Sequence, residues 1–417
     1  MTRMKDSGIE WIGEVPEEWG LKPIKYLVST PVTDGPHETP TLYDDGIPFL
    51  SAESVKNGIL DSRYKRGYIS ETAHKIFSRK VSPQKNDIFI VKSGATTGNV
   101  GIVNTDEIFD IWSPLALVRT RSDLANQKFI YYFMLSDAFT KQIQNKWSFG
   151  TQQNIGMGVI EKIKLVVPPL DEQTQIANFL DKKVAQLDSV KSLLEEQVKT
   201  LEDYRQSLIY ETVTKGLDKT VPLKDSGVDW IGQIPEGWGI TKFKYFLDTN
   251  KGLTITKESL IEDGIPVINY GQIHSKYGKS VNTDRDELPQ VSANYLKFKQ
   301  SLLKPGDFVF ADTSEDIDGS GNFSTRIDDN GELFAGYHTI KAKLKNALEH
   351  DFRYFMHYFD SLAFRKQVQN KVSGIKVYSI TQSILQETCL ILPSLYEQNQ
   401  IADFLDKKVA QLDKVKS

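Results

Sequence analysis

Apolar side chains recur every seven residues through a long segment in the middle of the chain. The positions are Leu180, Leu187, Leu194, Leu201 and Leu208, with Val184, Val190, Val198 and Tyr204 at offsets of three or four. This spacing places both sets on one stripe of an α-helix, as in a coiled-coil seam. The helix should begin near Asp171 and stop at Gly216, a residue type favoured just after a helix C-terminus. At about 1.5 Å per residue the rod is roughly 65 Å long, and its apolar stripe requires a partner.

A second segment near the end of the sequence offers that partner. Ser394-Leu395-Tyr396-Glu397 has the S-x-x-E form of a capping box. Leu405 and Leu412 continue the seven-residue spacing. No counterpart of residues 193–216 follows them, because the sequence reaches Ser417 first. We therefore expect the second helix to be a partner of the first. Either this second helix is shortened, or the distal half of the first helix pairs with something else.

The stretches before each helix have patterns that predict mixed α/β domains. In each, an Asp-Gly turn precedes a short strand, at residues 47–50 and 265–268, and a later turn runs into a β-rich strand. An aromatic helix follows, with Phe129, Tyr132, Phe133, Phe139 and Ile143 in the first stretch and Phe352, Phe355, Phe359 and Val368 in the second. Its three- and four-residue spacing favours a core face over a platform for base stacking.

Two segments of the chain are repeated almost unchanged. Residues 5–13 recur at 224–232, each copy leading into Pro-Glu-x-Trp-Gly, and residues 172–188 recur at 397–413. The stretches between these copies match only in outline. A repeated framework around variable domains indicates a pseudo-twofold tandem architecture. We predict an α+β fold with a domain over 1–168, a helix over 169–216, a second domain over 217–392 and a shortened helix over 393–417.

Composition is that of a soluble globular protein, with 39% hydrophobic and 25% charged residues. No apolar run approaches the roughly 18–20 residues that span a bilayer, and no apolar secretory segment follows Met1. The single cysteine, Cys389, excludes a disulfide framework within the chain and lies in an apolar run. We expect a cytoplasmic protein without membrane association, in which Cys389 is a small buried core residue.

The formal net charge of −4 would by itself argue against a nucleic-acid partner, but the charges are unevenly distributed along the chain. Residues 21–168 hold 18 Lys+Arg against 14 Asp+Glu, a net charge of +4, whereas residues 240–392 hold 19 of each. The acidity therefore lies in the repeated segments and helices. Since local field matters more than the sum of charges, binding of nucleic acid stays possible.

Motifs for catalysis are lacking. Gly278-Lys279-Ser280 resembles the end of a phosphate-binding loop, but Ile273 stands where the leading glycine belongs. His350 and His357 could share a helix face, yet no cysteine or carboxylate cluster accompanies them in metal-ligand spacing. We predict no catalytic residue and no metal site, although a nuclease that uses scattered carboxylates stays open.

Three segments of the first domain carry side chains suited to DNA. The candidates are Arg63, Lys65, Arg66, Lys92, Ser93, Thr96, Thr97, Asn99, Thr151, Gln152, Gln153 and Asn154. The cations at 63–66 suit phosphate neutralisation, the small donors at 92–99 suit close approach to the duplex, and the amides at 151–154 can pair with adenine. The respective alternatives are a solvated charged turn, an ordinary hairpin loop and a capped helix start.

The second domain has corresponding stretches at 312–315 and 373–378. Their candidate residues are Ser314, Lys376 and Tyr378. They share position with the first set but not chemistry, as expected if the two domains read different bases.

The whole arrangement resembles the DNA-specificity subunit of type I restriction–modification systems. The resemblance rests on Trp-Ile-Gly-x-x-Pro-x-x-Trp at 11–19 and 230–238, on the helix entry at 168–177, and on Tyr204-Arg205-Gln206-Ser207-Leu208-Ile209-Tyr210-Glu211. It implies two target-recognition domains, each reading half of a bipartite, asymmetric DNA sequence, separated by antiparallel helices. The seven leucines at 180, 187, 194, 201, 208, 405 and 412 would form the contact between those helices.

The resemblance also implies partners. A non-catalytic specificity subunit would bind double-stranded DNA and recruit two modification subunits and ATP-driven restriction subunits. S-adenosylmethionine, ATP and Mg²⁺ would then belong to those partners, and this chain would hold no cofactor. Two other classes stay open from the residues alone: a self-contained nuclease or methyltransferase, and a coiled-coil assembly scaffold without a nucleic-acid role.

Overall fold

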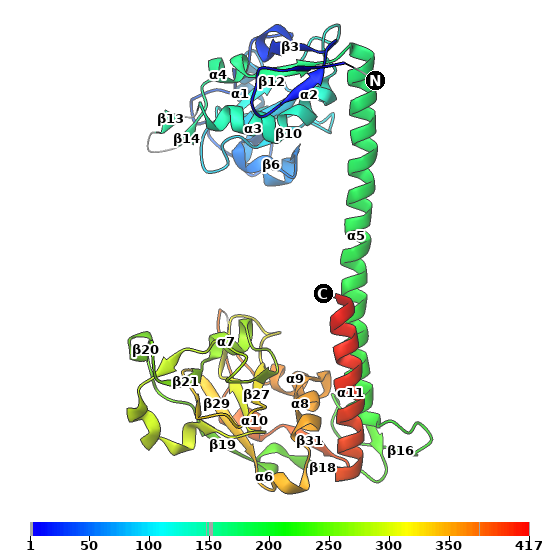
Figure 1. Ribbon diagram of the computed structural model, residues 1–417, viewed down its shortest axis with the longest axis vertical. Helices are drawn as coiled ribbons and strands as arrows, with labels where there is room; N and C mark the ends of the chain where they lie inside the picture. Colours follow the sequence, from blue (N-terminus) through cyan, green and yellow to red (C-terminus); the bar gives the residue numbers. More distant parts are fainter. Residues whose placement is uncertain (1–2, 147, 150–152, 375, 417) are drawn as a thin grey trace. The chain divides into compact units, whose positions relative to one another are not determined.

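The computed structural model describes residues 3–146, 148–149, 153–374 and 376–416. The chain divides into two compact units, Met1–Lys191 (unit 1) and Ser192–Ser417 (unit 2), and the division falls inside the long helix α5 (Leu170–Lys215) (Figure 1). Both units combine mixed sheets with short helices, so the predicted α+β class is confirmed. Gly216, which follows α5, has φ +71°, a conformation that ends a helix at little steric cost for glycine.

Unit 1 is built around the strand β9, whose four residues are fully buried. Among the described residues its main sheet has the order β4 (Thr33–Asp34), β12 (Leu115–Val118), β9 (Ile88–Val91), β10 (Val100–Ile102), β7 (Ile59–Leu60) and β6 (Val55–Lys56). Ile88 and Ile90 pack with the helices α2 (Gln127–Met134) and α3 (Asp137–Gln144). Phe89 and Val91 face a second cluster. The aromatic helices are thus core elements, as predicted.

The remaining elements of unit 1 flank this sheet. They are β1 (Met4–Asp6), β2 (Glu14–Pro16), β3 (Gly20–Pro23), β5 (Ile47–Leu50), β8 (Gly67–Ile69), α1 (Glu71–Phe77), β11 (Asp110–Ile111), β13 (Ser148–Phe149), β14 (Gln153–Asn154), α4 (Met157–Lys162) and β15 (Lys164–Val167). β15 pairs antiparallel with β3 and leads directly into α5. This short ladder fixes the point at which the domain meets its helix.

Unit 2 repeats the plan around β25 (Phe308–Ala311), which lies between β29 (Thr339–Leu344) and β27 (Phe323–Arg326). Phe308 and Phe310 pack against the helix α8 (Phe352–Asp360) in the largest core cluster. The further elements are β16 (Leu223–Asp225), β17 (Gln233–Pro235), β18 (Gly239–Lys242), α6 (Phe243–Phe246), β19 (Leu247–Lys251), β20 (Leu260–Ile261), β21 (Ile265–Ile268), α7 (Tyr270–Ser275), β22 (Ser280–Val281), β23 (Gln290–Val291), β24 (Leu302–Leu303), β26 (Thr313–Ser314), β28 (Leu333–Ala335), α9 (Leu362–Gln369), β30 (Tyr378–Ser379), α10 (Gln382–Gln386), β31 (Cys389–Leu392) and α11 (Leu395–Lys416). Cys389 is half-buried rather than fully buried, because it ends the edge pairing of β31 with β18.

The repeated tryptophan and glutamate fasten each domain to its helix. Trp19 donates from its indole nitrogen to Glu172 Oε2 over 3.0 Å, and Trp238 donates to Glu397 Oε1 over 2.9 Å. Each glutamate lies in the first turn of its helix, where a negative charge is favoured by the helix dipole. The repeated segments are therefore structural connections.

A buried glutamine next to each glutamate completes the connection. Gln173 accepts from the backbone nitrogen of Asn126, and Gln398 accepts from that of Asp351, over 2.9 and 3.0 Å. Asn126 and Asp351 are the residues that cap α2 and α8. Because both glutamines are at most 1% exposed, the helix start and the core helix of each unit are held in fixed register.

Replacing Gln398 with alanine should lower the free energy of unfolding by about 1–3 kcal/mol, because the Asp351 N–H is then buried without a partner. Asn399→Ala, at the exposed neighbouring position, is the matched control and should change it by less than about 0.5 kcal/mol. Chemical denaturation of the full chain measures both. Equal decreases in the free energy of unfolding of the two variants would show that the side-chain amide of Gln398 makes no specific contribution to stability.

The leucine stripe of α5 is covered only where a unit packs against it. In unit 2, α11 runs antiparallel beside the end of α5 (Figure 1), where Ile209 and Leu405 are fully buried and Leu208 packs against the same core. Leu180, Leu201 and Leu412 are half-buried. Leu187 and Leu194 are 67% and 56% exposed. Residues 184–194, between the two packed ends of α5, are therefore uncovered within this chain, and the need of this part of the stripe for a partner stays a prediction.

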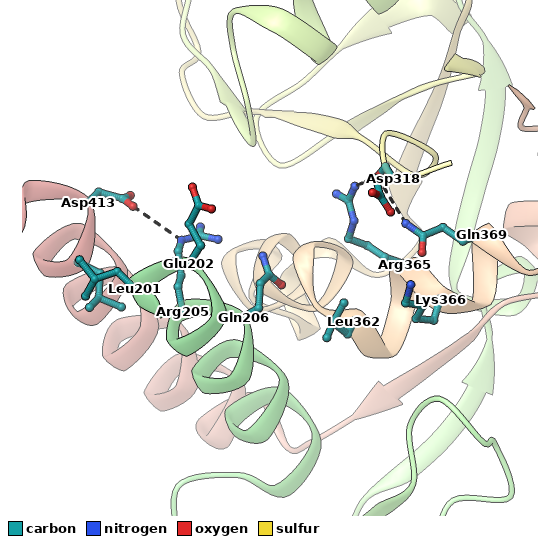
Figure 2. A pocket seen from close by; sticks show the side chains of 11 residues that line it. Leu201, Glu202, Arg205, Gln206, Asp318, Leu362, Arg365, Lys366, Gln369 and Asp413 are labelled. Carbon is teal, nitrogen blue, oxygen red and sulfur yellow. Dashed lines mark hydrogen bonds and ion pairs between the residues drawn. The ribbon is translucent and has the colours of Figure 1, made fainter. Parts of the chain in front are cut away.

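A buried ion cluster also ties α5 to the core helices of unit 2. Asp360, with a side chain only 4% exposed, accepts from Arg205 Nη1 over 3.1 Å and from Lys279 Nζ. Arg205 lies at one side of a hollow of about 650 Å³, and Arg365 of α9 lies at the other (Figure 2). Asp413 of α11 is 3.8 Å from Arg205 Nε. Arg205, on α5, therefore contacts both Asp360 and Asp413 of α11, and so connects the two long helices to Asp360.

Across the part of the chain that the structure describes, none of the helices is both long and apolar enough to cross a bilayer.

Candidate nucleic-acid interface

In unit 1 the loop that follows the central strand is joined to a hairpin distant in sequence. Gly94 donates from its backbone nitrogen to the carbonyl of Gln153 over 3.3 Å, and Ile155 donates to the carbonyl of Lys92 over 2.7 Å. The loop of residues 92–99 and the strand β14 therefore form one continuous surface, although about 60 residues separate them.

Some side chains on this surface are buried and hold the loop to the hairpin, whereas others are exposed to solvent. Thr97, 8% exposed, donates from Oγ1 to the carbonyls of Gly94 and Gln153 over 2.6 and 3.2 Å. Ser93 is half-buried and forms an antiparallel bridge with Asn154. The exposed candidates are Thr96, Asn99, Gln153 and Asn154. They present hydroxyl and amide groups, which match the donors and acceptors of base edges in the major groove.

Lys92 has an internal partner that the sequence did not indicate. Its Nζ lies 3.0 Å from Oδ2 of Asp34, and its side chain is 13% exposed. Burial opposes ionisation of Asp34, but hydrogen bonds from Lys80 and Lys92 outweigh it and lower the pKa of this carboxyl. The geometry therefore makes Lys92 an anchor for the loop and does not present its charge to a phosphate.

The cationic turn at 63–66 lies apart from that loop. Arg63 pairs with Asp61 over 2.6 Å, Lys65 lies over the ring of Tyr68, and Arg66 lies over Trp112 at 4.4 Å. Among the described residues, no hydrogen bond or ion pair joins the turn to residues 92–99. Arg63 and Arg66 are nevertheless exposed and could contact a duplex backbone.

Unit 2 makes the same connection with different side chains. β26, after the central strand, pairs antiparallel with β30, so that Thr313 faces Ser379 and Ser314 faces Tyr378. Ile380 donates from its backbone nitrogen to the carbonyl of Asp312 over 2.8 Å. Two candidate segments about 60 residues apart are again brought side by side.

The chemistry of this surface is acidic where that of unit 1 is neutral. Ser314 is only 3% exposed, so its hydroxyl is not presented to solvent. Glu315, Asp316 and Asp318 follow it and are exposed, as is Lys376 on the hairpin, while Tyr378 is half-buried. Exposed carboxylates repel phosphates but can accept from the amino groups of cytosine. This contrast agrees with two surfaces of different specificity.

Thr151 and Gln152 lie outside the described residues. The joining of each loop to its late hairpin had no signal in the sequence, since no spacing rule links segments so far apart. The Asp34–Lys92 pair was missed for the same reason. Among the described residues, no group of three histidine, cysteine, aspartate or glutamate side chains could hold a metal ion.

Solved structures with a similar fold belong to type I restriction–modification proteins. A chain from a structure on complex assembly and conformational transition of the type I R-M system matches with a TM-score of 0.68 at 15% identity, covering 96% of this chain and 93% of that chain. The HsdS subunit from Thermoanaerobacter tengcongensis matches with a TM-score of 0.53 at 15% identity, covering 97% and 93%. At such low identity these matches show the fold alone.

Sequence comparisons give the family. The chain is 24% identical over 96% of its length, and 88% of the relative's, to the type I restriction enzyme MjaVIII specificity subunit of Methanocaldococcus jannaschii. It is 22% identical over 97% and 84%, respectively, to the EcoKI specificity subunit of Escherichia coli K12. The family model for the type I restriction modification DNA specificity domain matches residues 31–200 and 235–416. The chain therefore belongs to the type I restriction–modification DNA-specificity family, and recognition of a DNA target is its role.

Proposed function

We propose that unit 1 and unit 2 each read one half of a bipartite, asymmetric DNA sequence. The observation that carries this proposal is the joined loop and hairpin that recurs in both units with unlike side chains. A shared backbone arrangement places the reading groups in the same way, whereas hydroxyls and amides in one unit and carboxylates in the other select different bases.

The chain acts as a non-catalytic subunit in this proposal. Its relatives are specificity subunits of restriction enzymes, and this chain would bind double-stranded DNA and position two modification subunits and the restriction subunits. Adenine-N6 methylation with S-adenosylmethionine and ATP- and Mg²⁺-dependent cleavage are then reactions of those partners. No cofactor is assigned to this chain.

Methylation mapping tests the division of labour between the units. DNA from a host that carries the chain with its partner subunits should show a two-part methylated motif. Exchanging residues 21–168 for those of another family member should replace one part and leave the other unchanged. A motif in one continuous block, or a change in both parts, would contradict reading by separate units.

An enzyme is the competing proposal. Purified chain with DNA, Mg²⁺ and S-adenosylmethionine should neither cleave nor methylate the DNA if the partners carry the chemistry. Turnover by the chain alone would overturn the non-catalytic role.

A further inference from the structure

A hollow of about 430 Å³ lies in unit 2 between β21, α7 and the turn that follows β28. Its apolar walls are Ile255, Leu260 and the rings of Tyr270 and Tyr337. The two rings stand at 65° to each other with centroids 6.2 Å apart. An apolar recess of this size, open at the surface, is large enough to receive part of a nucleobase.

Two amide side chains of the hollow have their oxygens engaged within the fold. Asn269 accepts at Oδ1 from the backbone nitrogen of Tyr337 over 2.7 Å, and Gln272 accepts at Oε1 from that of Asn269 over 3.0 Å. Because both amide oxygens already accept hydrogen bonds, the two amide nitrogens are the parts of these side chains that can donate to a ligand. In the described part of the chain neither nitrogen donates a hydrogen bond, nor does Lys257 Nζ. No carboxylate lines the hollow.

The hollow adjoins the candidate interface of unit 2. Tyr270 and Gly271 also line a second recess of about 560 Å³, whose other side includes Ser314, Glu315 and Asp316. The surface formed by β26 and its loop therefore continues onto the aromatic hollow. A duplex seated on that loop would bring a neighbouring base edge to Tyr270.

We propose that the hollow receives the 5-methyl group of a thymine, so that Tyr270, Tyr337 and the amides of Asn269 and Gln272 select T at one position of the half-site read by unit 2. This inference rests on the proposed function. In the major groove thymine combines a methyl group with an acceptor, O4, and so matches apolar walls beside the amide donors of Asn269 and Gln272. Cytosine and adenine present an amino donor there, and guanine presents two acceptors without an apolar group.

Replacement of thymine by uracil tests the methyl contact. Once mapping has given the motif, duplexes with uracil at single thymine positions are titrated with the chain assembled with its partner subunits. At one thymine of the half-site read by unit 2, uracil should weaken binding about fourfold, the loss expected for one buried methyl group. Uracil at thymines of the other half-site is the internal control.

Filling the hollow tests the residues. A Cβ at Gly271 would meet no atom within 4 Å, so Gly271→Leu should fold and place its side chain at the opening. We expect this variant to bind thymine and uracil duplexes equally at that position. Gly237→Leu, at another glycine of unit 2 with open space around its Cβ, is the matched control and should keep the fourfold preference.

The outcomes separate the two proposals. If no two-part motif is found, the proposed function itself fails. If the motif is found but the half-site of unit 2 has no thymine, or uracil is tolerated at each of its thymines, thymine reading by the hollow is overturned. A preference that survives in Gly271→Leu would likewise exclude this hollow as its origin.

Discussion

Asp360→Asn should lower the free energy of unfolding by about 3–5 kcal/mol, the range found when one partner of a buried ion pair is removed. Asp360 accepts from Arg205 and Lys279 in the core of unit 2, and its side chain is 4% exposed. The asparagine cannot neutralise the two cations, whose side chains are half-buried. Urea unfolding of the full chain, followed by the fluorescence of its tryptophans, measures the loss.

The pH dependence of this loss identifies its electrostatic origin. Burial opposes ionisation of Asp360, but the charges of Lys279 and Arg205 outweigh it and lower the pKa of the carboxyl. A carboxyl whose pKa is lower in the folded state stabilises the fold at pH values above its pKa in the unfolded state, about 3.9. This stabilisation is lost as the pH falls through the pKa of the folded state. The difference between wild type and Asp360→Asn should therefore shrink below about pH 4.

Asp413 supplies the matched control for that experiment. It lies 3.8 Å from the same arginine, but its side chain is 61% exposed. Exposed ion pairs contribute about 0–1 kcal/mol, so Asp413→Asn should have a small effect that salt reduces further. Similar losses in both variants would show that burial of Asp360 does not govern the contribution of this cluster.

The sequence predicted the elements better than their contacts. The seven-residue leucine spacing located α5 to within one or two residues, because helix formation depends on local periodicity. The same spacing predicted that the stripe needs a partner, but it did not indicate that Leu187 and Leu194 are exposed within this chain. Periodicity states which side chains share a face, but whether that face is covered depends on where other elements end.

The repeated segments show a similar limit. Identical glutamines at 173 and 398 indicated a common framework, but only the structure shows that each holds the capping residue of a core helix. At the interface the sequence identified loops of suitable chemistry without indicating that loop and hairpin pair. It also could not distinguish Lys92, which is paired with Asp34, from the exposed Asn99. Burial and partner choice are tertiary properties.

Inserting four residues into the exposed stretch of α5, between Ser189 and Val190, should lengthen the gap of the recognised motif by one or two base pairs. The half-sites should stay unchanged. Four residues add about 6 Å to a helix, close to the rise of two base pairs at about 3.4 Å each. They also add a rotation of about 40°, close to the twist of one base pair. Methylation mapping of the host reads the gap directly.

The site of insertion matters because Leu187, Val190 and Leu194 are exposed, so that lengthening the helix there removes no core contact. A length-neutral control, Ser189→Ala with Ser192→Ala, changes the same surface without moving either unit and should keep the original gap. An inserted chain that methylates the original motif would show that α5 does not set the spacing. Altered half-sites with an unchanged gap would show that the helix acts on the base contacts. A rigid spacer would instead change the separation of the two half-sites and leave the base contacts as they were.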